Sequence, residues 1–197
     1  MKKTIFLTAV LVLAVYCRAF AGTPAGILIY TQSGNETYIL LADHAFRSQQ
    51  KRGWGCFGGA AEQGESTAET AARETEEETR GYFKKELLLD KIKGAAPLMD
   101  EGFALYFVRV DFVPAVRIAN NTELGSDISY SERGPYAWIP FSDIQKYLSN
   151  EIDRKKTYPI DPDFLPENTC SRHYWTALLL NLKRAMAENR LPWIPVK

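Results

Sequence analysis

Short apolar runs, bounded by Gly, Asn, Ser or Pro, alternate along this chain with longer polar stretches. Runs that are rich in β-branched and aromatic residues favour strands. On this basis, strands are predicted at residues 25–31, 37–42, 87–92, 103–113 and 136–140. Because Ser33-Gly34-Asn35 is typical of a turn, the first two strands should lie side by side.

Two internal segments have the features of helices. The first, at about 65–80, contains neither Gly nor Pro and is dense in Ala and Glu, which favours a helix. Ser66 or Thr67 could cap its start, and Gly81 would end it. A shorter helix is predicted at about 142–148.

An extra C-terminal helix is predicted at about 171–189, because apolar residues recur there at helical spacing. These residues, which should face the core, are Trp175, Leu179, Leu182 and Met186. The connecting segments are polar or rich in Gly or Pro, and they cover 47–59, 114–136 and 155–169. No repeat or linker interrupts residues 22–197, which are expected to form a single α/β (α+β) domain with a mixed sheet.

Composition restricts the class of protein. At 197 residues, of which 46% are hydrophobic, the chain is long enough for one hydrophobic core. Lys and Arg together number 24, as do Asp and Glu, so the net charge gives no reason to expect a nucleic-acid partner. Aromatic residues make up 12%, which excludes low-complexity and collagen-like chains.

The N-terminal residues have the features of an export signal. Lys2 and Lys3 precede an uncharged, largely apolar run at 4–16, which is too short to cross a bilayer core of about 30 Å comfortably. Ala19-Phe20-Ala21 then places small residues where a signal peptidase cleaves. Residues 1–21 are therefore predicted to be removed, and the protein would be periplasmic or secreted, touching a membrane only through this segment.

An uncleaved amphipathic or membrane-anchoring helix is the alternative for this segment. Lipidation of Cys17 is disfavoured, because the preceding Tyr16 is bulky where a lipoprotein signal has a small residue. After removal of residues 1–21, Cys56 and Cys170 would remain. They could pair in an oxidising compartment, but two free thiols are favoured, because their positions in the sequence do not indicate spatial proximity.

The predicted helix at 65–80 holds the densest group of charged residues. Glu74, Glu77 and Glu78 are related as i, i+3 and i+4, so their carboxylates should share one face. Like charges so placed destabilise a helix by roughly 0.2–0.5 kcal/mol per pair. A hard divalent cation would offset this repulsion, because Mg²⁺ prefers carboxylate oxygens. A solvated acidic face is the alternative explanation for these three residues taken alone.

The wider spacing resembles the Nudix box of the Nudix hydrolases. In that box a Gly is followed after five residues by Glu, after seven more by Arg-Glu, and after two more by Glu-Glu. The matching residues are Gly59, Glu65, Arg73, Glu74, Glu77 and Glu78. Trp54, the paired strands in 25–42 and Trp138-Ile139-Pro140 also stand where Nudix domains carry such elements. The resemblance implies a Nudix-like α/β/α sandwich over most of 25–150, with 151–197 as a variable tail.

The resemblance also implies roles for the charged residues of the box. Glu77 and Glu78 would bind Mg²⁺ or Mn²⁺, and Glu74 would be a further ligand or the general base. Glu65 would support the metal ligands, and Arg73 would hold the carboxylates in register.

Further candidate site residues lie outside the helix. Gly58 and Gly59 would let the backbone turn tightly beside the substrate. Some family members add a carboxylate from the loop before the last strand, for which Glu132 is the candidate, with Glu123 and Glu101 as weaker ones.

A basic loop precedes the box. Arg47, Lys51 and Arg52 could contact phosphate or ribose, although a short charged loop is often solvated without a function.

Four positions depart from the family pattern. Thr75 stands where the box usually has an aliphatic residue, and Phe57 stands where a Pro often precedes the Gly pair. Arg80 occupies the position of a Gly, and Gly81 follows one position late. None of these residues is a metal carboxylate, so the resemblance implies an intact site on a divergent scaffold.

The implied activity is metal-dependent hydrolysis of a diphosphate that joins a nucleoside to another moiety. A diphosphate on an envelope lipid or glycan is an alternative substrate, because free nucleotides are scarce outside the cytoplasm. The protein could also be a catalytically weak nucleotide-binding module, or an interaction protein that docks a partner through residues 151–197. The resemblance leaves a homodimer open.

Overall fold

A mixed sheet forms the centre of the fold. The computed structural model describes residues 22–45, 52–122 and 133–195. Within them the sheet has seven strands: β1 (Ala25–Ser33), β2 (Glu36–Asp43), β3 (Trp54–Gly55), β4 (Phe57–Gly59), β5 (Leu98–Asp100), β6 (Phe103–Arg109) and β7 (Tyr136–Pro140). The main order is β3-β2-β1-β6-β5, while β4 also pairs with β1 and β7 with β2. β1 and β6 run parallel, and the other pairs are antiparallel.

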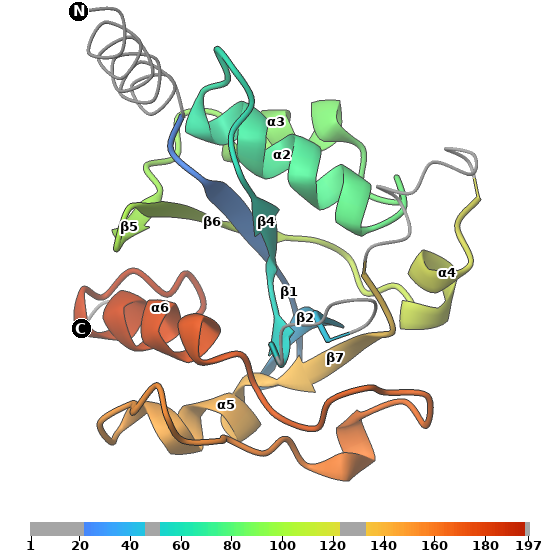
Figure 1. Cartoon of the computed structure of the whole chain (residues 1–197), viewed down its shortest axis with the longest axis vertical. Coiled ribbons are helices and arrows are strands. Elements are labelled where there is room, and N and C mark those ends of the chain that lie inside the picture. The colour runs from blue at the N-terminus through green and yellow to red at the C-terminus, as the bar shows by residue number, and fades with distance from the viewer. Residues whose placement is uncertain (1–21, 46–51, 123–132, 196–197) are drawn as a thin grey trace, which may run out of the picture.

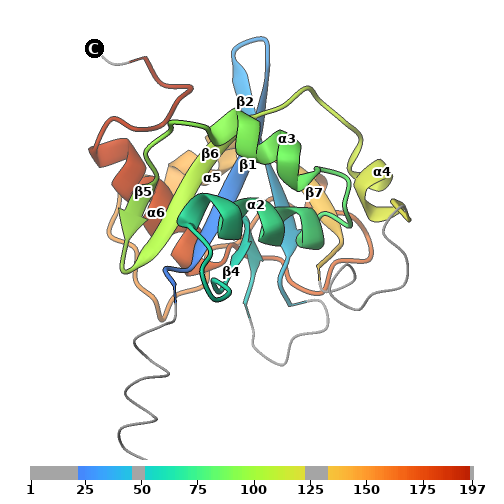
Figure 2. The same cartoon turned by 90° about the horizontal axis from the view of Figure 1, so that it is seen from above.

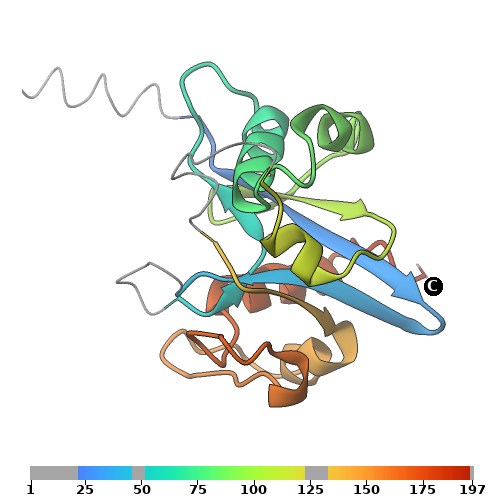
Figure 3. The ribbon, with the colours of Figure 1, turned by 90° about the vertical axis from the view of Figure 1, so that its right-hand side faces the viewer.

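Helices cover both faces of this sheet (Figure 1). One face carries α2 (Thr67–Glu78) and α3 (Lys85–Ile92), and the other carries α5 (Phe141–Leu148) and α6 (Thr176–Ala187), as the turned view also shows (Figure 3). Two shorter elements are α4 (Ala115–Ala119) and the 3₁₀ turn η2 (Pro162–Phe164). The expected α/β/α arrangement around a mixed sheet is therefore confirmed.

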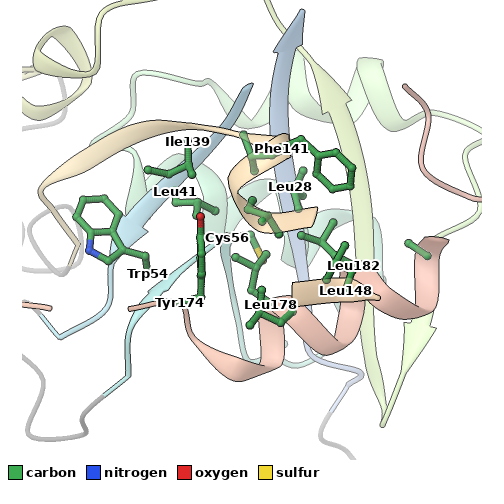
Figure 4. Close-up of a cluster of buried hydrophobic side chains, with 14 of the residues drawn as sticks. Leu28, Leu41, Trp54, Cys56, Ile139, Phe141, Leu148, Tyr174, Leu178 and Leu182 are labelled. Carbon is green, nitrogen blue, oxygen red and sulfur yellow. The ribbon is translucent and has the colours of Figure 1, made fainter. Parts of the chain in front are cut away.

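Two apolar clusters fill the space between the layers. The cluster on the α5 and α6 side includes Leu28, Leu41, Trp54, Tyr174, Leu178 and Leu182 (Figure 4). The cluster beneath α2 and α3 includes Ile27, Ile29, Phe57, Ala72 and Leu88. Successive side chains of a strand point to opposite faces, so the continuous apolar run of β1 supplies Leu28 to one cluster and its two neighbours to the other.

The strand predicted at residues 87–92 is wrong, because these residues form most of helix α3. Leu88 and Ile92, four residues apart, are buried, whereas Leu87 is 51% exposed. A short apolar run fits a strand or a helix equally well, so the run of three leucines conceals this spacing. The surrounding Lys, Glu and Leu residues have high helix propensity, and they decide the outcome.

Several predicted boundaries also change. The strand predicted at 103–113 ends at Arg109, where its pairing with β1 ends. The polar connection at 114–136 contains α4, and the loop at 47–59 ends in β3 and β4. The box helix starts two residues later than its predicted first residue, after Ser66.

The C-terminal helix is predicted to begin at residue 171, but α6 begins at Thr176. The preceding residues instead run beside β3. The N–H of Trp54 donates to the carbonyl of His173 over 2.8 Å, and the N–H of Trp175 donates to the carbonyl of Trp54 over 2.8 Å. The sequence pattern misses this pairing because it depends on a partner more than one hundred positions away.

Residues 169–175, here called the strap, are held by one buried carboxylate at the end of β2. Asp43 Oδ2 accepts hydrogen bonds from the N–H groups of Cys170 (2.7 Å) and Ser171 (2.8 Å) and from Thr169 Oγ1 (3.0 Å). Asp43 Oδ1 accepts from Ser171 Oγ over 2.8 Å and from Ala45 N–H over 3.0 Å. The C-terminal segment is thus part of the folded core rather than an appendage.

Cys170 lies exposed on the strap and Cys56 is buried between β3 and β4. Both are free thiols, as expected from the sequence.

The predicted export signal at residues 1–21 lies outside the described residues. In the part of the chain that the structure describes, every helix is too short or too polar to cross a membrane.

Candidate active site

Helix α2 packs on one face of the sheet (Figure 2), and hydrogen bonds at its start and in its interior stabilise it. Ser66 and Glu69 form a capping box, in which Ser66 N–H donates to Glu69 Oε2 over 2.8 Å and Glu69 N–H donates to Ser66 Oγ over 3.3 Å. Inside the helix, Thr75 is fully buried, and its hydroxyl donates to the carbonyl of Ala71 over 2.7 Å. The polar atom of this unusual box residue is therefore satisfied within the helix itself.

The end of α2 keeps the turn that Gly normally provides. The N–H of Arg80 donates to the carbonyl of Glu77 (3.0 Å), and the N–H of Gly81 donates to that of Glu76 (2.7 Å), which is a Schellman pattern. Arg80 has a φ of 55°, in the left-handed region that favours Gly. The departure from the family pattern at Arg80 therefore changes the side chain but not the path of the backbone.

Arg73 lies at the centre of three box carboxylates. Its Nε donates to Glu65 Oε1 over 2.8 Å, and its Nη2 reaches Glu65 Oε2 (3.1 Å) and the carbonyl of Ala60 (2.9 Å). Its Nη1 lies 3.1 Å from Glu77 Oε2 and 3.1 Å from Glu74 Oε1. The guanidinium fork thus fixes these carboxylates relative to the loop that precedes the helix.

The carboxylates in this cluster have different proton affinities. The hydrogen bonds from Arg73 lower the pKa of Glu65 to about 2, so Glu65 is a permanent anion near neutral pH. Burial raises the pKa of Glu74, while the charge of Arg73 opposes that rise. A raised pKa suits a carboxylate that accepts a proton during a reaction, so Glu74 fits the role of general base better than Glu65.

Glu78 is the most buried carboxylate of the box, with a side chain that is 3% exposed. Its Oε2 accepts a hydrogen bond from Gly58 N–H over 2.9 Å, and its Oε1 lies 2.6 Å from Nη2 of Arg133. The hydroxyl of Tyr136 donates to the backbone carbonyl of Glu78 over 2.7 Å. These contacts connect the end of α2 to β4 and to the start of β7.

Gly59 leaves room for the Glu74 carboxylate in its present position. A Cβ atom on Gly59 would lie 2.3 Å from Glu74 Oε2, far inside van der Waals contact. The absence of a side chain at Gly59 therefore lets the β4 backbone approach the Glu74 carboxylate closely.

Replacing Gly59 by Ala should displace the Glu74 carboxylate while leaving the fold intact, because the side-chain end can move. We expect kcat/KM to fall by about 10²-fold, the cost of a misplacement of about 1 Å in an active site. Steady-state kinetics with a diphosphate substrate would measure this, and the melting temperature would serve as the control. A Gly59→Ala protein with full activity would show that the close contact has no catalytic consequence.

The chemistry of these side chains fits a hard divalent cation. Glu74, Glu77 and Glu78 bring carboxylate oxygens to one side of α2, and oxygens are the donors that Mg²⁺ and Mn²⁺ prefer. Among the described residues no three acidic, His or Cys side chains already form a metal-binding group. The guanidinium groups of Arg73 and Arg133 contact carboxylate oxygens of all three residues.

A pocket of about 210 Å³ lies on the other side of β4. Its walls come from β4, β5, β6 and α6 and include Phe57, Gly58, Phe103, Trp175, Leu178 and Asn181. The pocket combines aromatic rings with the amide of Asn181, which can both donate and accept hydrogen bonds. It meets the carboxylate cluster at Gly58, because the N–H of that residue holds Glu78.

The remaining predicted site residues do not join the carboxylate cluster or lie outside the described part of the chain. Arg52 places its guanidinium 5.1 Å from the ring centroid of Trp175, which lines the pocket, but Arg52 itself is not among the lining residues. Glu101 lines the pocket and pairs with Arg154 instead of joining the box carboxylates. Arg47, Glu123 and Glu132 lie outside the described residues.

The residues at this site that the sequence does not predict include Arg133, Trp175 and Asn181. Trp175 and Asn181 are hidden because they belong to the C-terminal segment, where a helical apolar stripe indicates only core packing. Arg133 directly follows Glu132, the candidate loop carboxylate, so attention to the opposite charge in the same loop could have found it.

Comparison with known proteins agrees with this geometry. The family model of the NUDIX domain matches residues 22–159, which is more than half of the chain. A search of curated proteins finds no match. The matched range holds all box residues and Arg133, while Trp175, Leu178 and Asn181 of the pocket lie beyond it. The chain therefore belongs to the Nudix family, whose members are pyrophosphohydrolases of nucleoside diphosphates linked to another moiety and generally use divalent metals.

Proposed function

We propose that this protein is a Mg²⁺- or Mn²⁺-dependent pyrophosphohydrolase that acts on a nucleoside diphosphate linked to another moiety. The observation that carries the proposal is the junction at Gly58. This residue holds Glu78 of the carboxylate cluster through its N–H and also lines the pocket beyond β4. A substrate that spans the junction would place its diphosphate at the carboxylates and its nucleobase among the aromatic rings.

The residues of the box would have separate roles at the diphosphate: holding the cation, accepting a proton and positioning the ligands. Glu77 and Glu78 would hold the cation, which neutralises phosphate oxygens and activates an attacking water when bound. Glu74, whose pKa is raised by burial, would accept a proton from that water. Arg73 and Glu65 keep the ligands in place through their paired contacts. Water adds across one P–O bond of the diphosphate and yields two phosphate-terminated products.

The pocket supports a flat, partly polar leaving group. Phe103 and Trp175 provide aromatic surface, and base stacking on such rings contributes about 1–3 kcal/mol per base. Asn181, which is 7% exposed, supplies an amide for the polar edge of a base. An envelope lipid diphosphate has no such flat group, so the pocket favours the nucleotide alternative.

The function is tested by incubating the purified protein with Mg²⁺ or Mn²⁺ and a panel of diphosphates. The panel would contain a dinucleotide, ADP-ribose, a nucleotide sugar and a prenyl diphosphate, with products followed by ³¹P NMR. Cation-dependent cleavage of the nucleotide members supports the proposal. Cleavage of the prenyl compound alone favours an envelope substrate, and tight nucleotide binding without turnover favours a binding module.

Replacement of Trp175 by Leu should raise KM for the nucleotide substrate by about tenfold or more, because one stacking surface is lost. Because Trp175 lines the pocket across β4 from the box carboxylates, kcat should change less than KM. Phe112→Leu is a matched control, since Phe112 is 63% exposed and does not line the pocket. Equal KM values for the two variants would exclude Trp175 from substrate binding.

We also propose that the protein is exported, on the basis of residues 1–21 alone. Fractionation of cells that express the full chain, followed by N-terminal sequencing, tests this. A mature protein that begins at Gly22 outside the cytoplasm supports export, whereas an intact Met1 in the cytosolic fraction contradicts it.

A further inference from the structure

Arg133 is the second arginine of the carboxylate cluster, and the Nudix box does not include it. It lies outside the regular elements, a few residues before β7. Its Nη2 is 2.6 Å from Glu78 Oε1, and the two side chains are 16% and 3% exposed, respectively. Arg133 therefore faces Glu78, whereas the ion pairs of Arg73 are with Glu65, Glu74 and Glu77.

The burial of Glu78 explains why a positively charged side chain lies beside it. A carboxylate that is almost fully removed from water is destabilised unless hydrogen bonds and an opposite charge compensate. Gly58 N–H supplies one hydrogen bond, and Arg133 supplies the positive charge. Arg133 is thus the counter-ion of Glu78 in the cation-free protein.

A divalent cation and Arg133 compete for the same oxygen. If Glu78 ligates a metal through Oε1, the guanidinium at 2.6 Å from that atom stands where the cation has to bind, and the two positive charges repel each other. Arg73 also contacts oxygens of Glu74 and Glu77, but its hydrogen bonds to Glu65 and to the carbonyl of Ala60 hold it in place beside them. Cation binding therefore requires Arg133 to leave Glu78.

The released guanidinium has an obvious anion to bind. A diphosphate that binds the cation places its oxygens next to Glu78. These oxygens then lie within reach of the Arg133 side chain. Guanidinium groups bind phosphate oxygens in a bidentate manner. We propose that Arg133 is a further substrate-binding residue, which neutralises Glu78 in the cation-free protein and binds the diphosphate once a divalent cation has taken Glu78. This inference rests on the proposed metal-dependent function.

The test uses Arg133→Gln and Arg133→Lys in the full-length protein, with Arg117→Gln on α4 as a control for the loss of an exposed arginine. Three quantities are measured: the melting temperature without cation, the Kd for Mn²⁺ alone by electron paramagnetic resonance, and the Kd for inorganic pyrophosphate with saturating Mn²⁺ by calorimetry. None of these requires turnover.

For Arg133→Gln we expect a lower melting temperature without cation, because Glu78 loses its counter-ion. The Kd for Mn²⁺ should fall about tenfold, because the competitor is gone, and the Kd for pyrophosphate should rise about tenfold or more, because a charged hydrogen bond is lost. Arg133→Lys should lie between Arg133→Gln and the wild type in all three measurements, and Arg117→Gln should match the wild type.

Two results would overturn the inference. An unchanged or weaker Mn²⁺ affinity in Arg133→Gln would show that Arg133 does not compete for Glu78. An unchanged pyrophosphate affinity, with only the melting temperature lowered, would leave Arg133 a purely structural role. If the wild type binds Mn²⁺ but cleaves no diphosphate, the proposed function fails, while the binding measurements still decide the role of Arg133.

Discussion

Replacing Glu78 by Gln is expected to lower kcat/KM by at least about 10²-fold while the protein stays folded. Gln has the shape of Glu and can still accept the hydrogen bond from Gly58 N–H, but it removes the negative charge that would hold a divalent cation. Metal catalysis contributes several kcal/mol of transition-state stabilisation, which corresponds to such a factor. Steady-state kinetics with Mg²⁺ and a cleaved diphosphate, beside a circular dichroism spectrum, would measure the effect.

Glu76→Gln is the matched control for this experiment. Glu76 lies on the same helix and has the same chemistry, but it is not a box position. We expect its kcat/KM to stay within about twofold of the wild type, because it removes only a partly exposed charge. Comparable losses in the two variants would mean that the helix charge as a whole matters, and that Glu78 has no particular role.

Replacing Asp43 by Ala should lower the free energy of unfolding by about 4 kcal/mol, which is a large part of the stability of a typical domain. Asp43 is fully buried and accepts the hydrogen bonds that hold the strap. Hydrogen bonds to a charged acceptor contribute about 1.5–3 kcal/mol each, and the N–H and hydroxyl of the buried Ser171 would lose their acceptor. Urea denaturation followed by tryptophan fluorescence would give the change.

Two further variants test whether the effect comes from the negative charge of Asp43 and whether it is specific to this buried carboxylate. Asp43→Asn keeps one acceptor oxygen and should lose less than Asp43→Ala. Asp161→Asn is the matched control, because the Asp161 carboxylate also accepts a backbone N–H, that of Asp163, but is exposed. A loss of equal size in Asp43→Asn and Asp161→Asn would show that the buried strap contacts add nothing beyond an ordinary cap. Because the strap carries Trp175, KM should also rise in Asp43→Ala.

The part of the site that the sequence predicts depends on local spacing. Glu65, Arg73 and Glu77 meet in space because they lie on or next to one helix, whose period turns sequence distance into position. The same holds for the helix start at Ser66, where a short-range capping box forms.

The part that the sequence does not predict depends on distant partners. Arg133 reaches Glu78 because β7 pairs with β2 and begins beside the end of α2, and no local pattern records that pairing. The strap is extended because Trp54 offers it a backbone partner, so the helix predicted from residue 171 begins only at Thr176. The wrong strand prediction in α3 has a different cause, because a short run of leucines fits the strand pattern and the helix pattern equally well.

The strap and α6 also set the order in which this enzyme can be built during synthesis. They are the last described elements of the chain, yet together with α5 they cover one face of the sheet, and they form part of the wall of the pocket (Figure 1). A nascent chain that has reached only residue 159 would hold every box residue but would lack the part of the apolar cluster over Leu28, Leu41 and Trp54 that Tyr174 and α6 supply. Such an intermediate exposes apolar surface and invites aggregation or chaperone binding, so the catalytic helix precedes a folded enzyme by the time needed to translate its C-terminal segment.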